Sequence, residues 1–108
     1  MNVDQALLRR HLKQLQLNLA HLALWQAMPP QQERLVSEQP FHVDTLEPHE
    51  WLQWIFLPRM SALLDSGAEL PTKIAITPYI EEAMSGMERI ELLLKPLSEI
   101  EELLNDHR

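Results

Sequence analysis

The stretch Gln39–Met60, QPFHVDTLEPHEWLQWIFLPRM, decides the fold of this 108-residue chain. It contains two of the three tryptophans, both phenylalanines and three of the eight prolines. Asp44 and Glu47 have the D-x-x-E spacing of a capping box, and Pro48 follows in the first turn, where a missing N–H does no harm. The sequence therefore predicts a helix that begins at Asp44 or Thr45.

The predicted helix is apolar on nearly every side from Trp51 to Leu64. A helix that is apolar all round must be surrounded by other elements, so we expect it to be the hub of the fold. Pro58 lacks the N–H of an interior helical residue and should kink this helix or restart it. Asp65 to Gly67 should end the helix, with Gly67 in the left-handed conformation.

The N-terminal part of the chain also favours a helix. Glycine is scarce in the chain, and Leu, Gln and Glu are abundant. We expect a helix from Asp4, as N-cap or first-turn residue, to Trp25, before the two prolines at positions 29 and 30. Because its apolar seam spans about two heptads, packing inside a bundle is favoured over a coiled-coil dimer. The seam consists of Leu8, Leu12, Leu15, Leu19 and Leu22.

Residues 30–43 are expected to form a connector with packing of its own. The first half is interpreted as one or two helical turns that point Leu35 and Val36 inward. In the second half Phe41 and Val43 alternate with a polar residue, so an extended segment should lay both apolar side chains on the bundle.

Two further helices are predicted in the last third of the chain. Thr77 as N-cap and Pro78 at the first helical position indicate a short helix that ends near Gly86. A longer helix over residues 87–105 has apolar residues three and four apart, and Pro96 inside it should kink or split it. The elements predict an all-α fold. It is one domain over 1–108, a small four-helix bundle (five helices counting short turns) around a kinked central helix.

Composition restricts the compartment and the classes of site. The chain has no cysteine, which excludes disulfides and thiolate metal sites. The N-terminus lacks the uninterrupted apolar core of a signal peptide, and no apolar run approaches the ~20 residues of a membrane span. We therefore expect a soluble cytoplasmic protein that does not bind membranes.

The net charge of −7 is spread unevenly along the chain. Residues 1–40 carry four basic and three acidic side chains, whereas residues 77–108 carry three basic and eight acidic ones. An acidic chain is repelled by phosphates, so direct nucleic-acid binding is not expected. The acidic C-terminal face would instead suit a basic protein partner.

Three runs of the sequence resemble the YqcC-like family of small bacterial proteins. They are QPFHVDTLEPHEWLQWIFLPRM, LLDSGAELP and ITPYIEEAM. The resemblance is close over residues 39–84, extends over the whole chain, and departs from the family pattern at the Lys95-Pro96 step. It implies a small all-α bundle. The family has no established biochemical role, but its gene commonly lies beside that of tRNA pseudouridine synthase C.

The resemblance supplies no catalytic residues. A pseudouridine synthase needs a larger, sheet-based fold around an aspartate nucleophile, and the four aspartates here lie in helical or cap contexts. They are Asp4, Asp44, Asp65 and Asp106. The serines lack a G-x-S-x-G context, and two isolated glycines make no phosphate-binding loop. We therefore predict that the chain is not an enzyme.

One dense group of residues has the chemistry of metal ligands. It consists of His42, Asp44, Glu47, His49 and Glu50. The group lacks the second histidine of H-E-x-x-H and the E-x-x-H pairs of di-iron bundles. Helix capping and surface positions explain these residues, so neither a metal nor another cofactor is predicted.

Trp51 and Trp54 are interpreted first as core residues and second as part of an exposed patch for a partner. Base stacking would need interleaved basic residues, and only Arg59 is near. Arg59 falls on an apolar face, and a buried guanidinium requires a carboxylate or carbonyl partner. The candidate carboxylates are Asp44, Glu47 and Glu81.

The favoured function is an interaction or accessory module, linked to tRNA pseudouridine synthesis by gene association alone. One alternative is a homodimer formed through the leucine seams or the tryptophan region. Another is a small-molecule binder with a cleft beside the central helix. The predicted partner or pocket residues are His42, His49, Trp51, Trp54, Arg59 and Tyr79.

Overall fold

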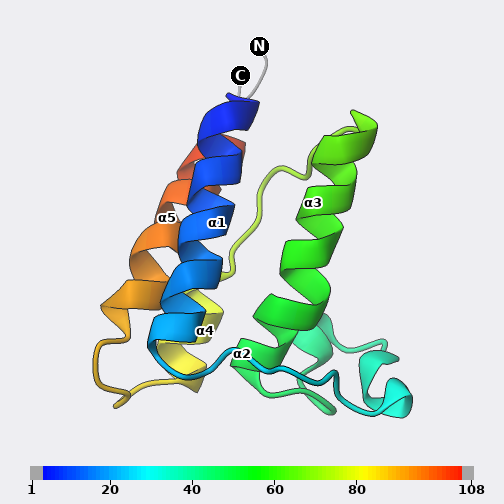
Figure 1. Cartoon of the computed structure of the whole chain (residues 1–108), viewed down its shortest axis with the longest axis vertical. Helices are drawn as coiled ribbons and strands as arrows, with labels where there is room; N and C mark the ends of the chain where they lie inside the picture. The colour runs from blue at the N-terminus through cyan, green and yellow to red at the C-terminus, as the bar shows by residue number, and fades with distance from the viewer. Residues whose placement is uncertain (1–3, 106–108) are drawn as a thin grey trace.

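The computed structural model describes residues 4–105, and every regular element in this range is helical. Figure 1 shows α1 and α5 side by side and antiparallel, with α3 beside α1 and the short α4 against α5. The prediction of an all-α, four-helix fold is confirmed, with α2, η3 and α3 forming one continuous helical span. The elements are α1 (Gln5–His21), the 3₁₀ turns η1 (Gln32–Leu35) and η2 (Pro40–His42), α2 (Pro48–Trp51), the π-helical turn η3 (Leu52–Phe56), α3 (Leu57–Ser66), α4 (Thr77–Ala83) and α5 (Glu91–Asn105).

The leucine seam of α1 is buried against the matching seam of α5. Asp4 caps α1 as predicted, because its carboxylate accepts the N–H of Leu7 at 3.0 Å. The first four leucines of the α1 seam are at most 5% exposed, and the fifth, Leu22, is half-buried. On the facing helix Leu93, Leu97 and Ile100 are fully buried. The prediction that the α1 seam packs within the chain is therefore confirmed.

Helix α1 ends at His21, earlier than the predicted Trp25. Ala23 adopts a left-handed conformation with φ of 63°, and the N–H of Leu24 donates to the carbonyl of Leu19 at 2.9 Å. This is the Schellman arrangement, which normally uses glycine at the left-handed position. The sequence signal was missed because an alanine occupies it.

The central helical span begins one turn later than predicted. Glu47 is its N-cap and Pro48 lies in the first turn. The backbone N–H of Glu47 donates to Oε1 of Glu50 at 2.8 Å, so Glu50 reaches back as the third residue of a capping box does. Asp44 instead accepts a hydrogen bond from Ser37 at 2.6 Å.

The discontinuity expected at Pro58 takes the form of the π-helical turn η3 that precedes it. The N–H of Leu57 bonds to the carbonyl of Leu52, five residues back, so the helix is widened just before the proline. Helix α3 then continues through Pro58 to Gly67, which ends it with φ of 70° as predicted.

The central span is not surrounded on all sides. It contributes many buried side chains, but Pro58 and Arg59 are exposed to solvent. The apolar hub was overestimated because the π-turn rotates the residues after it relative to a regular helix. The buried side chains of this span are Glu50, Trp51, Leu52, Gln53, Phe56, Leu57, Met60 and Leu64.

Helix α4 is capped by another helix instead of by its own threonine. Oε2 of Glu101, on α5, accepts the N–H groups of Ile76 at 2.5 Å and Thr77 at 2.6 Å. The Thr77 hydroxyl is buried and has no hydrogen-bond partner among residues 4–105. The prediction that Thr77 is the N-cap is therefore wrong, although the short helix begins and ends close to where it was expected.

Helix α5 runs through Pro96 without splitting, and it begins at Glu91 instead of Met87. Arg89 just before it has φ of 63°, which keeps the preceding residues out of the helix. Pro96 is buried. In the part of the chain that the structure describes, no helix is long and apolar enough to cross a membrane.

Candidate functional site

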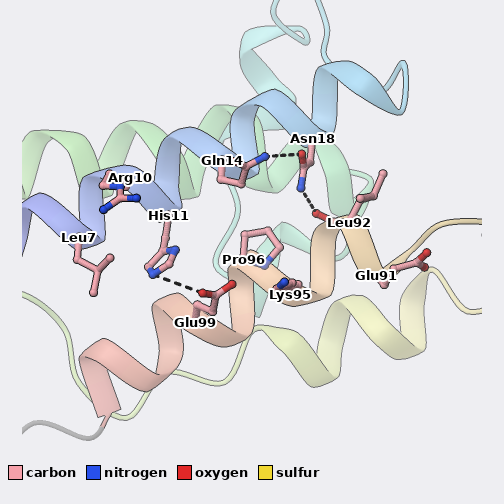
Figure 2. A pocket seen from close by; sticks show the side chains of 10 residues that line it. All are labelled: Leu7, Arg10, His11, Gln14, Asn18, Glu91, Leu92, Lys95, Pro96 and Glu99. Carbon is pink, nitrogen blue, oxygen red and sulfur yellow. Dashed lines mark hydrogen bonds and ion pairs between the residues drawn. The ribbon is translucent and has the colours of Figure 1, made fainter.

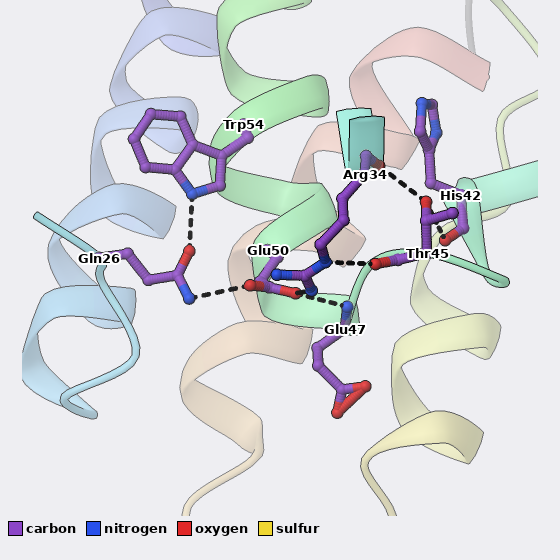
Figure 3. A network of polar contacts seen from close by, with 7 residues as sticks. All are labelled: Gln26, Arg34, His42, Thr45, Glu47, Glu50 and Trp54. Atoms are coloured by element: carbon purple, nitrogen blue, oxygen red, sulfur yellow. Dashed lines mark hydrogen bonds and ion pairs between the residues drawn. The ribbon is translucent and has the colours of Figure 1, made fainter. Parts of the chain in front are cut away.

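A polar network is centred on Glu50, the most buried charged side chain of the described region, at 4% exposed. Its Oε1 accepts from the Arg34 guanidinium at 2.5 Å, and its Oε2 accepts from the side-chain amide of Gln26 at 3.0 Å (Figure 3). Gln26 in turn accepts from the indole N–H of Trp54 at 2.8 Å. The network joins the segment after α1 to the central span.

The charge of Glu50 is stabilised by these partners. Burial by itself would raise the pKa of Glu50. Hydrogen bonds from the Glu47 backbone, Gln26 and Arg34, together with the positive charge of Arg34, outweigh burial and lower the pKa below its ordinary value. Glu50 is therefore an ionised structural carboxylate at neutral pH.

The segment Arg34–Thr45, called here the closed loop, has its two ends tied together. Nε of Arg34 donates to the Thr45 carbonyl at 2.9 Å, and the Thr45 hydroxyl donates to the Arg34 carbonyl at 2.7 Å (Figure 3). Nε2 of His42 donates to the carbonyl of Leu35 at 3.0 Å. This compact loop with adjacent ends has the form of an Ω-loop, a class that is frequently functional.

Phe41 fastens the closed loop to an aromatic cluster. Its ring stacks on Tyr79 with centroids 4.2 Å apart and planes 7° apart, and it meets Trp51 edge-on at 5.0 Å. Phe41 and His42 have φ of 58° and 51°, a left-handed conformation that is unusual for bulky residues. Burial raises the pKa of Tyr79, and the nearby charge of Glu47 adds to this. Aromatic packing thus holds a strained backbone in place.

The structure divides the predicted partner or pocket residues among several places. Trp51 and Tyr79 meet through Phe41 in the aromatic cluster. His42 lies in the closed loop, and His49 is half-buried on α2. The other two residues, Trp54 and Arg59, do not take part in this aromatic cluster.

Arg59 is exposed, and no carboxylate partners it within residues 4–105. The prediction of a buried ion pair at Arg59 is therefore wrong. The buried guanidinium contact belongs instead to Arg34 with Glu50, which sequence reasoning missed. The sequence signal for a structural role of Glu50 is its position three residues after the N-cap Glu47, which is followed by Pro48.

Trp54 lines a shallow groove of about 450 Å³. The groove lies between the segment that follows α1 and the central span, and Pro58 and Trp25 also line it. The Gln53 side chain, beneath it, makes a reciprocal pair of hydrogen bonds with the Gln26 backbone, at 2.7 and 2.8 Å. A cleft beside the central helix was expected, but the structure lines it with Trp25 and glutamines and not with Trp51, Tyr79 or Arg59.

A second groove, of about 490 Å³, lies between α1 and α5 (Figure 2). Nε2 of His11 lies 3.7 Å from Oε2 of Glu99 across it. Asn18 donates to the Leu92 carbonyl at 2.7 Å at the other end. These contacts join the two helices, so much of the polar lining has a structural partner.

Several of the candidate metal ligands have other partners in the fold. Across residues 4–105 no three His, Asp or Glu side chains gather as metal ligands. Glu50 is occupied by Arg34, and the Nε2 of His42 is occupied by a backbone carbonyl. Asp106, counted on the acidic C-terminal face, lies outside the described residues.

Sequence comparisons connect the chain to small bacterial proteins. A family model described as tRNA pseudouridine synthase C matches residues 7–103. An uncharacterized protein of Haemophilus influenzae is 54% identical over 99 residues, which cover 92% of this chain and 93% of that protein. The uncharacterized protein YqcC of Escherichia coli is 41% identical over 83 residues, 76% of each chain.

A solved structure has the same fold. The solution NMR structure of YqcC from E. coli matches with a TM-score of 0.85 and 35% identity, covering 99% of this chain and 92% of that one. A different relative is much longer. A tRNA pseudouridine synthase C of Pectobacterium carotovorum is 49% identical over 63 residues, which are 58% of this chain but only 17% of that protein. The coverage and identity of the other matches show that this chain belongs to the YqcC-like family, whose model bears the description tRNA pseudouridine synthase C.

Proposed function

We propose that the chain is a cytoplasmic protein-interaction module that serves tRNA pseudouridine synthase C without being the catalyst. The supporting observation is the Pectobacterium protein of that name, in which a segment similar to this chain makes up 17% of a longer polypeptide. Two modules in one chain meet at a high effective concentration. When the same modules are separate chains, a docking surface must replace the covalent link.

The charge of the chain fits such a partner. The net charge is −7, which disfavours direct contact with RNA phosphates. An enzyme that acts on tRNA needs a basic surface for the phosphates, and an acidic protein complements a basic surface. The module is therefore expected to touch the enzyme and not the RNA.

The described aspartates support the non-catalytic assignment. Asp4 caps α1, Asp44 accepts from Ser37, and Asp65 pairs with Arg9 at 2.9 Å. Each carboxylate thus has a structural partner on the surface of a helical fold. A reacting aspartate would instead lie in a concave site that holds its substrate.

Co-purification tests the proposal directly. The chain, carrying an affinity tag, is expressed in its native host and recovered at low salt, where attraction between opposite charges is strongest. We expect tRNA pseudouridine synthase C in the recovered fraction and its loss as salt is raised. Recovery that never contains the synthase at low salt contradicts the proposal.

A small-molecule binder is a second candidate, favoured by the groove at Trp54 and Trp25. Tryptophan side chains there offer an apolar floor, and Gln16 adds an amide to the lining, whereas the amides of Gln26 and Gln53 are bound within the chain. A thermal-shift screen of metabolites with the wild-type chain and Trp54→Ala tests this candidate. A stabilising compound whose effect disappears in the variant supports it, and a screen without any stabilising compound counts against it.

A further inference from the structure

Exposed apolar side chains concentrate on one segment of the described region. Five large apolar residues are exposed, and four of them lie between Trp25 and Val43. The most prominent in the closed loop are Val36, at 74% exposed, and Val43, at 57%. The sequence predicted both valines to face inward, so the structure reverses their expected position.

The two valines lie on neighbouring segments of the closed loop. The hydrogen bonds between Arg34 and Thr45 and from His42 to Leu35 bring the start of the loop beside its end. Val36 is in the first of these segments and Val43 is in the second. The loop therefore exposes two branched apolar side chains, each next in sequence to a residue of the Leu35–His42 contact. A single exposed apolar residue would need no explanation.

Two contacts anchor the closed loop to the helices it packs on. The Arg34 guanidinium is bound to buried Glu50, and the Phe41 ring is stacked on Tyr79. Phe41 and His42 are two successive residues in the left-handed conformation, which residues other than glycine rarely adopt. These contacts hold the loop in a strained conformation, with its two valines exposed. A surface that is already in its bound conformation loses less conformational entropy on binding.

The surroundings of the valines are acidic. Residues 31–47 contain four carboxylates, and the one Lys or Arg among them, Arg34, is bound by Glu50. The four carboxylates are all on exposed residues: Glu33, Glu38, Asp44 and Glu47. Protein interfaces usually have an apolar centre and a polar rim, and in this segment the residues available for the rim are acidic, which favours a basic partner.

The acidic C-terminal face is less available than its composition suggests. Glu101 accepts two backbone N–H groups at the start of α4, and Glu99 lies against His11. Carboxylates with internal partners contribute less to a docking surface, and in and beside the loop this also applies to Asp44, which accepts from Ser37, and to Glu47, which caps the central span. The closed loop combines exposed charge with exposed apolar area, and the C-terminal face offers mainly charge.

We infer that the closed loop Arg34–Thr45 is the surface that docks the basic, tRNA-binding part of tRNA pseudouridine synthase C, with Val36 and Val43 as its apolar contacts. This inference rests on the proposed function, since the Pectobacterium chain supplies the identity of the partner. The rim carboxylates steer the encounter, and the valines fill an apolar depression on the enzyme.

Binding of the full-length chain to the full-length synthase of the same host tests the inference by calorimetry at low salt. The double variant Val36→Glu with Val43→Glu should weaken binding by about tenfold or more, because charge enters the apolar centre. Leu17→Glu is the matched control. It makes the same change at an apolar residue that is 50% exposed on α1, and it should leave the affinity unchanged.

Charge variants give an independent readout. Glu38→Lys in the loop should weaken binding several-fold and flatten its salt dependence, whereas Glu102→Lys on the C-terminal face should not. If wild type binds the synthase and the loop variants bind it equally well, the inference is overturned and the proposed function stands. The same holds if only Glu102→Lys loses affinity. A wild-type chain that does not bind the synthase overturns both. Thermal melting shows whether each variant folds. If the double valine variant does not fold, the affinity of Glu38→Lys decides the test.

Discussion

The side-chain amide of Asn18 donates a hydrogen bond to the backbone carbonyl of Leu92 at 2.7 Å, joining α1 to α5 (Figure 2). Leu92 lies four residues before Pro96, so it is the carbonyl that a regular helix would pair with the N–H that proline lacks. Gln14 donates to the Asn18 oxygen at 2.8 Å and orients the amide. A neighbouring helix thus supplies the donor that Pro96 removes.

Asn18→Ala should lower the free energy of unfolding by about 1–2 kcal/mol, because it leaves a partly buried carbonyl without a partner. In a Pro96→Ala background the loss should be smaller, since the restored backbone N–H at position 96 can bond to Leu92. Urea unfolding of the two single variants and the double variant measures this coupling. Equal losses in both backgrounds would contradict the compensating role of Asn18.

Arg34→Met and Arg59→Met should differ strongly in stability. Removing the Arg34 guanidinium leaves buried Glu50 without its charged partner, and the expected loss is about 2 kcal/mol. Arg59 is exposed, so its replacement should change stability by no more than about 0.5 kcal/mol. Thermal and urea melts of both variants provide the measurement. A loss at Arg59 as large as that at Arg34 would restore the sequence-based prediction.

Stability should fall in acid partly through Glu50. Its pKa in the folded chain lies below the ordinary value of 4.5, so its contribution is present above that pH and is lost as pH falls through the lowered pKa. In Arg34→Met the pKa of Glu50 should rise, because the hydrogen bond and the positive charge of Arg34 no longer oppose the effect of burial. The stability difference between wild type and Arg34→Met should therefore shrink as the pH falls below the ordinary value of 4.5 and through the lowered pKa of Glu50.

Urea unfolding at a series of pH values measures this difference, with Glu50→Gln as the control that cannot titrate. The control should lose less stability than wild type across the same acidic range. If Glu50→Gln and wild type lose the same amount, another carboxylate is responsible.

Ala23→Gly should stabilise the chain by about 0.5–1 kcal/mol. Ala23 has φ of 63° at the end of α1, a conformation that glycine adopts without the steric penalty of a Cβ atom. Ala20→Gly, on an exposed face inside α1, should have the opposite effect and cost up to about 1 kcal/mol. Differential scanning calorimetry of the two variants tests whether the sign of the stability change follows the backbone conformation at each position.

Glu101→Gln should lower the free energy of unfolding by about 1 kcal/mol, because its carboxylate caps two N–H groups at the start of α4. Glu102→Gln changes an exposed neighbour on the same helix and should have little effect. Amide hydrogen exchange of Ile76 and Thr77 should accelerate only in the first variant. Unchanged exchange there would exclude the cap.

The sequence by itself determined the features that depend on residues close together in the chain. The spacing of Leu8 to Leu19 and of Leu93 to Leu104 sets the buried seams, since a helix brings residues three and four apart to one face. Gly67 and Pro48 mark helix boundaries through their own backbone preferences. Asp4 caps its helix through an interaction only three residues long.

Only the tertiary structure decided the contacts that carry the candidate site. Arg34 meets Glu50 across 16 residues, and Glu101 caps α4 across 24 residues. Phe41 reaches Tyr79 on another helix, and Val36 and Val43 on either side of Phe41 in the loop are exposed. A local pattern cannot identify such partners, because many residues could supply each charge or ring. Helix packing selects the one that reaches its buried counterpart.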